Sequence, residues 1–396
     1  MSQKAVIAGF GESTVSRPKS RNDGAPMRSK EQYLADALTS VLKNCGLEKR
    51  ELDGQGICVA GTGGGHGSSG ERWSSEVIHD LGIGPSWLIR TDQGGSSSLV
   101  QLIQAALAIE RGEVDLVLCV GGGSTIFGET DQTFYVKNFE MPFGMMGPNS
   151  LFGLILKRHM HKYGTEPGQL GKIAVTQRFH ASLNPNAYLR KRITIEDYLS
   201  SAMISDPIRL LDCCIPVSGA ACFLMASEER SRSITDHPIF IKGFGQCFNY
   251  QTGTPYRDEI TDFGMRIAAT RAFERATLRK DRVSFLQLYD DYTIAVLIQL
   301  EDMGFCAKGG GGKFLDRTDI SYRGELPINT GGGMLSGGQI GGGFVHLIEA
   351  IKQLKGEAGS RQVKDPEIGL VTGMGGESYS NNLINHVAVI LSNNEH

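Results

Sequence analysis

The chain carries one short arrangement twice: a helical segment, a turn, and an apolar run that ends in glycines. In the first copy Gln104–Gly112 leads into DLVLCVGGG at Asp115–Gly123. In the second, Ile351–Gly356 leads into IGLVTGMGG at Ile368–Gly376. A short continuous apolar run is typical of a strand buried on both faces, and its alternation with helices indicates an α/β fold. Because the unit recurs, we expect a duplicated α/β fold whose two halves pack face to face.

Other apolar runs extend this pattern through both halves, for which we expect the bounds 1–235 and 236–396. The expected strands are Val6–Phe10, Gly56–Ala60, Trp87–Ile89, Ile239–Phe244, Phe285–Tyr289, Leu326–Ile328 and Val387–Leu391. Residues 124–207 are richer in aromatic, histidine and polar side chains. We interpret them as a segment that covers a site.

The composition excludes several classes of partner. The chain has 40 basic and 43 acidic residues, a formal net charge of −3, and no long run of like charge, so we expect neither nucleic acid nor membrane as a partner. The first residues lack the apolar core of a signal peptide, which favours a cytoplasmic location. The eight cysteines contain no C-x-x-C pair and are interpreted as reduced thiols, without a metal site.

The glycine-rich loops are poor candidates for nucleotide binding. Neither Gly61–Gly70 nor Gly309–Gly312 has the residue order of a phosphate-binding P-loop. We interpret them as tight or mobile turns, with His66 in the first of them.

The segment Thr91–Gly112 (TDQGGSSSLVQLIQAALAIERG) is more informative, because a strand ends in a glycine pair and serines precede an apolar helix. A helix N-terminus aimed at a cleft can activate a nucleophile or stabilise an oxyanion. The segment resembles the one in which the thiolase superfamily carries its nucleophilic cysteine before a helix of the type QAALAIxxGExD. Counted back from Gln104, Gly95 occupies the place of that cysteine.

Further segments resemble the sterol-carrier-type branch of the same superfamily. They are Asn184–Ala187 (NPNA), Asp206–Ala226, Tyr289–Thr293 (YDDYT), Asn329–Glu349 and Gly373–Gly376 (GMGG). The resemblance implies the thiolase fold, in which two α/β halves are layered as helix, sheet, helix, sheet, helix.

The four active-site positions of a thiolase all differ in this chain. The nucleophilic cysteine, the G-H-P-type histidine, the second cysteine and the Asn or His of the N-E-A-F or H-D-C-F motif correspond to Gly95, Gln339, Gly373 and Tyr289. Without a thiolate there is no acyl-enzyme, and without the histidine and second cysteine there is no base for a thiol and no acid for an enolate. Ordinary thiolysis is therefore not expected.

The chain also resembles the lipid-transfer-type aldolases of steroid side-chain degradation, which lack the cysteine and rely on tyrosines. The resemblance gives catalytic roles to Tyr289, with Tyr292 beside it, and to Gln339, which stands where that branch has its second tyrosine. The implied reaction is retro-aldol cleavage of a β-hydroxyacyl-CoA, which needs a base, a stabilised enolate and a proton donor but no covalent intermediate. The alternative interpretation of Tyr289 is a half-buried tyrosine whose hydroxyl bonds to a neighbour.

Two groups of residues are expected to contact the substrate. Backbone N–H groups would stabilise the enolate oxygen, from Gly95, Ser96, Gly373, Gly375 and Gly376. The covering segment would bind the coenzyme A ester, through His180, Arg178, Arg190 and Arg192, although a solvated helix face explains these arginines equally well. The remaining histidines, including His346, are interpreted as surface or core residues.

The resemblance also implies partners. We expect a homodimer formed through the first half, combined with a small zinc-ribbon and OB-fold subunit into a complex of two and two, with a coenzyme A thioester as substrate and no covalently bound cofactor. Two alternatives stay open: a non-catalytic subunit that binds an acyl-CoA, a lipid or a partner enzyme, and an acyl-transfer component that uses a nucleophile from another polypeptide.

Overall fold

The computed structural model describes residues 4–17, 28–60, 73–123, 138, 141–145, 147–248, 259–377 and 383–395. The glycine-rich loop at 61–70 with His66, and most of the first part of the covering segment, lie outside these ranges. Among the described residues no helix is long and apolar enough to cross a membrane.

In the described part of the chain, the first half contributes five strands to the large sheet. They are β1 (Ala5–Glu12), β2 (Gly56–Ala60), β3 (Trp87–Thr91), β4 (Leu116–Gly123) and β7 (Gly219–Ser227). Their spatial order is β1-β7-β4-β2-β3, with the first two pairings antiparallel and the last two parallel. Strand β3 was expected to be buried, but it lies at the edge of the sheet and Leu88 is 41% exposed.

The second half repeats this order and these directions. Its strands are β8 (Ile239–Phe248), β9 (Phe285–Gln287), β10 (Ile368–Glu377) and β11 (Leu383–Ser392), arranged β8-β11-β10-β9. The first two pairings are antiparallel and the third is parallel. The expected strand at Leu326–Ile328 shrinks to one parallel bridge between Leu286 and Ile328, in the place that β3 takes in the first half. The repeated topology confirms the duplication.

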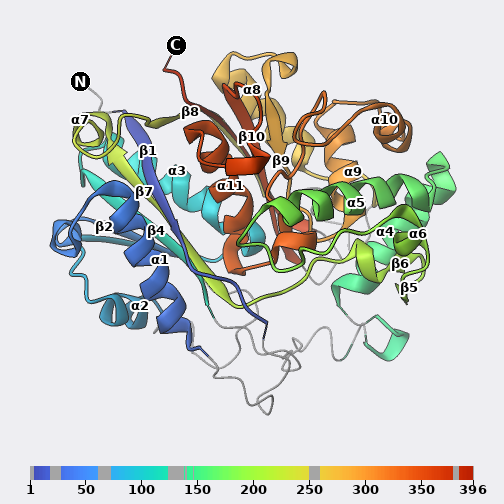
Figure 1. Ribbon diagram of the computed structural model, residues 1–396, viewed down its shortest axis with the longest axis horizontal. Coiled ribbons are helices and arrows are strands. Elements are labelled where there is room, and N and C mark those ends of the chain that lie inside the picture. Colours follow the sequence, from blue (N-terminus) through green and yellow to red (C-terminus); the bar gives the residue numbers. More distant parts are fainter. Residues whose placement is uncertain are drawn as a thin grey trace.

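Five layers result from this arrangement, and Figure 1 shows them from the first half (blue) to the second (orange and red). Helices α1 (Lys30–Cys45) and α2 (Trp73–Leu81) cover the outer face of the first sheet, and α8 (Met265–Ala276) and α9 (Thr293–Asp302) cover the outer face of the second. Helices α3 (Ser97–Glu110) and α11 (Phe344–Lys355) lie between the two sheets. An antiparallel pairing of β1 with β8 joins the sheets at one edge.

The alternation of side chains along each strand explains why the layers form. In β4, Leu118 belongs to the apolar cluster under α1, whereas Val117 and Cys119 belong to the central cluster with α3 and α11. In β10, Val371 faces the central cluster and Leu370 faces the outer one. Inner strands such as β4 and β10 are therefore buried on both faces, as their continuous apolar runs predict.

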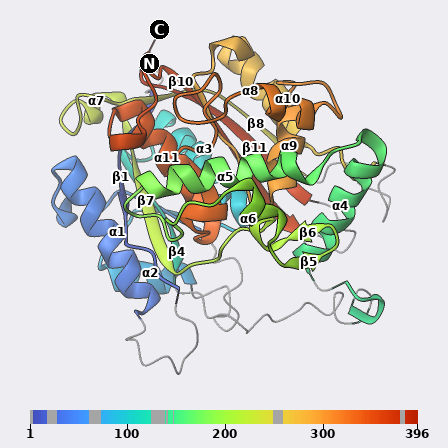
Figure 2. The same cartoon turned by 45° about the vertical axis from the view of Figure 1, so that its right-hand side comes forward.

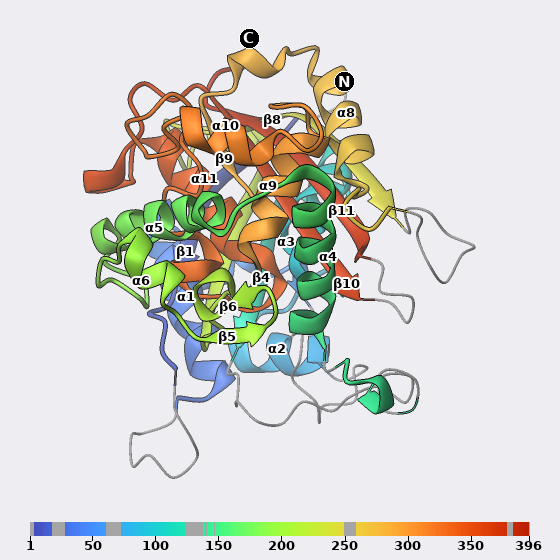
Figure 3. The same ribbon diagram turned by 90° about the vertical axis from the view of Figure 1, so that its right-hand side faces the viewer.

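The covering segment is largely helical where it is described. It contains α4 (Pro148–Tyr163), α5 (Pro167–Leu183), α6 (Ile195–Leu199) and the small hairpin of β5 (Met203–Ser205) and β6 (Ile208–Arg209). Figures 2 and 3 show these elements (green) lying over the second half. Two further short helices are α7 (Glu228–Ser231) and α10 (Gly311–Arg317). The exact division of the halves at residue 235 stays a prediction.

Candidate active site

Gly95 and Tyr289 share one space at the centre of the molecule. Gly95 lies in a short turn, Gly94–Ser96, between β3 and α3, and Tyr289 follows β9 just before α9. A Cβ atom built on Gly95 would lie 2.0 Å from Cε2 of Tyr289 and 2.2 Å from its hydroxyl oxygen. The phenol ring therefore fills the position of a side chain at residue 95. In this conformation, any side chain at residue 95 would overlap the ring of Tyr289.

Three further glycines bring distant main-chain segments against the turn at Gly95. A Cβ on Gly343 would lie 1.9 Å from the carbonyl oxygen of Gly95, and one on Gly373 would lie 2.8 Å from Cα of Ser96. A Cβ on Gly375 would lie 2.0 Å from the carbonyl oxygen of Gln93. Only glycine permits such approaches, so the start of α11 and the end of β10 converge on this turn.

Hydrogen bonds fix the turn in place. The hydroxyl of Ser96 donates to the carbonyl of Gln93 at 2.7 Å and accepts from Nδ2 of Asn385 at 2.8 Å. The backbone N–H of Ser96 also donates to Gln93, at 3.2 Å. The structure thus brings together Gly95, Ser96, Gly373 and Gly375 from the expected site loops, and Gly376 follows them in β10. Which N–H groups stabilise an enolate stays a prediction.

Tyr289 is buried, with 6% of its surface exposed. Its backbone N–H donates to Oγ1 of Thr372 at 3.0 Å, and its carbonyl accepts from Nε2 of Gln299 at 2.7 Å, so the residue is tied to β10 and α9. Burial, together with the charge of Asp291, raises the pKa of the phenol well above its usual value, and a hydrogen bond from Gln339 acts in the opposite direction. The ring therefore carries its proton at neutral pH and can donate it.

Gln339 links Tyr289 to Cys214. Its side-chain oxygen Oε1 accepts a hydrogen bond from the Cys214 thiol at 3.2 Å. Backbone bonds to Ile215 and Val217 hold the residue beside the first half. Because the amide oxygen accepts from Cys214, the amide nitrogen is the group directed to Tyr289. Loss of hydration and the charge of Asp291 raise the pKa of Cys214 well above its usual value, so this thiol is a poor nucleophile.

The carboxylate of Asp290 accepts hydrogen bonds from two other segments of the chain. It accepts from the backbone N–H groups of Met334 at 2.8 Å and Leu335 at 3.2 Å. It also accepts from Nε2 of His346 at 2.7 Å. These donors lie in the turn Gly333–Gly337 and in α11, so Asp290 holds both against the end of β9.

Tyr292, the second expected tyrosine, contacts the covering segment. Its hydroxyl donates to Oδ1 of Asn149 at 2.6 Å, and its ring stacks on Phe152 with centroids 4.2 Å apart. Both partners belong to α4. A catalytic role for Tyr292 stays a prediction, because the contacts described place its hydroxyl on α4.

The expectation that His180 binds substrate is not supported. Nδ1 of His180 donates to the carbonyl of Asn329 at 3.1 Å, and Nε2 accepts from the backbone N–H of Tyr322 at 2.9 Å. Burial lowers its pKa to about 4, so the ring is neutral. Both ring nitrogens are already bonded to the main chain, which leaves neither for a substrate.

The three arginines do not form one cluster. Arg178 is only 7% exposed and donates to Oγ of Ser336 at 2.8 Å, so it fixes α5 to the turn Gly333–Gly337 instead of reaching solvent. Arg190 and Arg192 are exposed, and the guanidinium of Arg192 stacks over Phe179 at 4.5 Å. The last two stay candidates for phosphate contacts.

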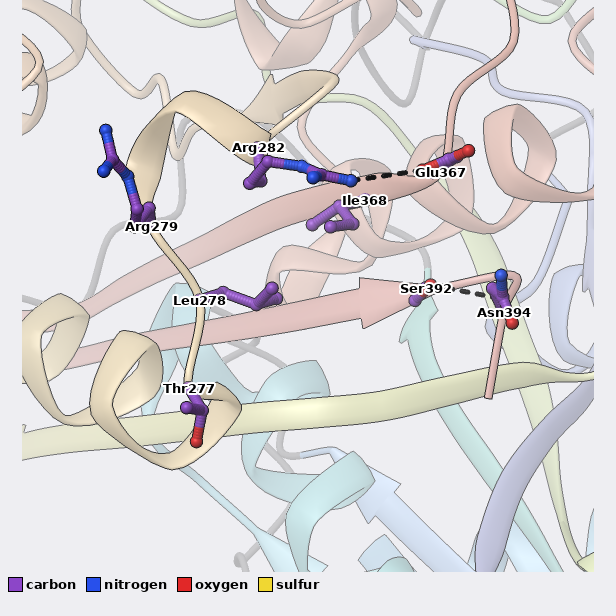
Figure 4. A pocket seen from close by; sticks show the side chains of 8 residues that line it. All are labelled: Thr277, Leu278, Arg279, Arg282, Glu367, Ile368, Ser392 and Asn394. Carbon is purple, nitrogen blue, oxygen red and sulfur yellow. Dashed lines mark hydrogen bonds and ion pairs between the residues drawn. The ribbon is translucent and has the colours of Figure 1, made fainter. Parts of the chain in front are cut away.

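A surface cavity of about 340 Å³ lies away from this site (Figure 4). Its walls include Arg282 and Glu367, whose side chains approach to 3.8 Å, and Ile368 at the start of β10. Gly373 lies five residues further along the strand, or roughly 17 Å at the usual rise per residue. In the described part of the chain, no group of three His, Cys, Asp or Glu side chains could hold a metal ion.

Several contacts of the site are not predicted from the sequence, among them those of Cys214 with Gln339 and of His346 with Asp290. The first pair is separated by 125 residues and the second by 56. No sequence motif joins either pair, so only the folded chain brings them together.

The chain resembles several known proteins over most of its length. The family described as "Thiolase C-terminal domain-like" matches residues 250–393. The chain is 30% identical over 378 residues to a steroid side-chain-cleaving aldolase of Thermomonospora curvata, covering 89% of this chain and 90% of the relative. It is also 30% identical over 378 residues to the 17-hydroxy-3-oxo-4-pregnene-20-carboxyl-CoA lyase of Mycobacterium tuberculosis, covering 90% and 92%.

Overall identity alone does not distinguish lyases from acyltransferases. The chain is 30% identical over 351 residues to an acetyl-CoA acetyltransferase of Methanothermobacter thermautotrophicus, covering 87% of this chain and 90% of the relative. Among solved structures, the Ltp2-ChsH2(DUF35) aldolase is 28% identical and superposes with a TM-score of 0.83, covering 100% of this chain and 99% of the other. The side chains around Gly95 must therefore be used to distinguish a lyase from an acyltransferase.

Proposed function

Because the chain belongs to the thiolase superfamily, in its aldolase-like branch, we propose that it is a carbon–carbon lyase that cleaves a β-hydroxyacyl-CoA by retro-aldol chemistry. The products are a ketone or aldehyde and a shorter acyl-CoA. The observation that carries the proposal is the shared space of Gly95 and Tyr289. Where a thiolase has its nucleophile, this chain places a phenol.

The replacement of a nucleophilic thiol by a phenol favours acid–base chemistry without a covalent intermediate. A residue without a side chain at position 95 forms no acyl-enzyme, and burial raises the pKa of Cys213 and of Cys306 to about 12, so neither is a ready substitute. A protonated Tyr289, by contrast, is suited to give a proton to the α-carbon of a thioester enolate. Retro-aldol cleavage needs this donor and no covalent intermediate.

Gln339 supports the same role. Its amide N–H donates toward the phenol oxygen, which stabilises the negative charge that develops there as the proton leaves. Backbone N–H groups of the turn at Gly95 and of the end of β10 would stabilise the enolate oxygen. The coenzyme A moiety would extend toward the exposed Arg190 and Arg192.

We further propose that the active form is a complex with a DUF35 protein, since the solved aldolase that resembles this chain contains one. By the family resemblance, that partner is a small zinc-ribbon and OB-fold subunit in an assembly of two and two. The chain supplies the catalytic residues described above.

The test is cleavage of 17-hydroxy-3-oxo-4-pregnene-20-carboxyl-CoA, and of simpler tertiary β-hydroxyacyl-CoA esters, by the chain co-purified with its DUF35 partner. Wild-type protein should release a ketone and an acyl-CoA, and Tyr289→Phe should lose most of that activity, on the order of 100-fold or more. Absence of cleavage with every ester, in a complex that binds acyl-CoA, would favour the non-catalytic subunit instead.

A further inference from the structure

We infer that His346, held by Asp290, is the base of this site and accepts the proton of the substrate's β-hydroxyl. The inference rests on the proposed lyase function and adds to it the group that a retro-aldol reaction needs besides a proton donor. His346 lies in the first turn of α11 and is 1% exposed.

The hydrogen bond to Asp290 sets the protonation pattern of the ring. Nε2 of His346 lies 2.7 Å from Oδ1 of Asp290. The carboxylate also accepts from two backbone N–H groups, those of Met334 and Leu335, so it acts as an acceptor toward the ring. Nε2 of His346 therefore carries the proton, and in the neutral ring Nδ1 carries a lone pair.

That lone pair has no partner among the residues that the structure describes. Nδ1 of His346 is buried and makes no hydrogen bond there. Leaving a buried acceptor unpaired costs about 1–3 kcal/mol, which a purely structural histidine avoids. His180 provides the contrast, because both of its ring nitrogens are bonded to the main chain.

His346 lies close to Tyr289, in the turn of α11 that approaches Gly95. The N-terminal turn of α11 lies against the carbonyl of Gly95 through Gly343, and the hydroxyl of Ser98 donates to the Gly343 carbonyl at 3.0 Å. Side chains in a helix lean toward its N-terminus, so His346 leans toward this contact. The ring centroids of His346 and Tyr289 are 5.9 Å apart. The proposed base and the proposed proton donor are therefore neighbours.

The proton transfers balance without a co-reactant. The β-hydroxyl proton moves to Nδ1 of His346, and the oxygen's electrons form the carbonyl of the departing ketone. The broken carbon–carbon bond leaves its electron pair on the α-carbon as a thioester enolate. Tyr289 gives its proton to that carbon, and the proton on His346 then replaces the one that Tyr289 lost. His346 thus acts as the base and Tyr289 as the acid of the same site.

The test compares His346→Gln with His180→Gln in the complete complex with the DUF35 partner. The glutamine amide can still donate to Asp290 but cannot take a proton. We expect His346→Gln to lower kcat by about 100- to 10,000-fold with KM within threefold of wild type. His180→Gln, an equally buried substitution, should keep kcat within about fivefold. A His346→Gln enzyme that stays folded and keeps kcat within fivefold of wild type overturns the inference while the lyase function stands. Absence of cleavage by the wild type would instead reject the function itself.

A second measurement uses the wild-type protein and so does not depend on the folding of a variant. A thioether analogue of the β-hydroxyacyl-CoA lacks the carbonyl that receives the electrons and is not cleaved. In a crystal structure of its complex, the β-hydroxyl should lie within hydrogen-bonding distance of Nδ1 of His346, roughly 2.6–3.2 Å. A hydroxyl bonded to other groups, with Nδ1 out of reach, would reject His346 as the base.

Discussion

The hydroxyl oxygen of Tyr289 lies within 2.2 Å of the point where the Cβ of any side chain at Gly95 would begin. A cysteine at position 95 and the phenol ring of Tyr289 therefore cannot both be accommodated in this conformation. Tyr289 can take its observed position only because residue 95 is a glycine.

Gly95→Ala should reduce both stability and cleavage. The added methyl group displaces the phenol ring, and overpacking of this kind costs typically about 1–3 kcal/mol. Gly95→Ala combined with Tyr289→Gly should recover stability, since the smaller residue leaves room, but not activity. Urea denaturation and kcat together check this. Equal stability of Gly95→Ala and wild type would contradict the shared space.

Gly95→Cys should not produce a thiolase. The thiol enters an occupied space, and the base and acid of a thiolase are absent at Gln339 and Gly373. We expect the variant to lose lyase activity without gaining thiolysis of a 3-ketoacyl-CoA, measured by the disappearance of the ketoester absorbance. Thiolysis well above the wild-type background would show that the old reaction needs only the cysteine.

Gln339→Glu should lower kcat more than Gln339→Asn does. A carboxylate beside the phenol removes the amide donor and adds negative charge, and both changes disfavour transfer of the Tyr289 proton. We expect a loss of about 10- to 100-fold for the carboxylate, at unchanged acyl-CoA affinity. Cys214→Ala serves as the matched control for the other end of the amide. If Gln339→Glu were as active as wild type, the amide would have no role in the proton transfer.

His180 should make stability depend on pH. Its pKa is lowered to about 4 in the folded chain from a usual value near 6.5. The unfolded chain therefore takes up a proton first as the pH falls, so stability present above pH 6.5 declines between pH 6.5 and 4. By linkage the decline is on the order of 3 kcal/mol. Unfolding free energies measured across this range should fall more steeply for wild type than for His180→Gln. Parallel curves would contradict the buried neutral ring.

The repeated helix and strand pattern was enough to predict a duplicated α/β fold, because buried strands can be recognised from local apolar runs. The thiolase fold itself was implied by the family resemblance, and the order of the strands was set only by the tertiary structure. Gly95 was found by counting along one helix from Gln104. Contacts between distant residues were beyond such reasoning. His180 was assigned to substrate on its position in the covering segment, yet its two main-chain partners, Asn329 and Tyr322, are set only by the tertiary fold. His346 is interpreted from the sequence as a surface or core residue, since nothing there reveals its hydrogen bond to Asp290 or the Nδ1 atom that has no partner among the described residues.

The most direct test of the central claim is a mass balance under turnover. The chain, with its DUF35 partner, is incubated with a β-hydroxyacyl-CoA in the absence of free coenzyme A, and the products and the intact protein masses are measured together. A lyase without a covalent intermediate predicts equal amounts of ketone and shorter acyl-CoA, with both polypeptides unmodified. A requirement for added coenzyme A, or an acyl group attached to either polypeptide, would contradict the account.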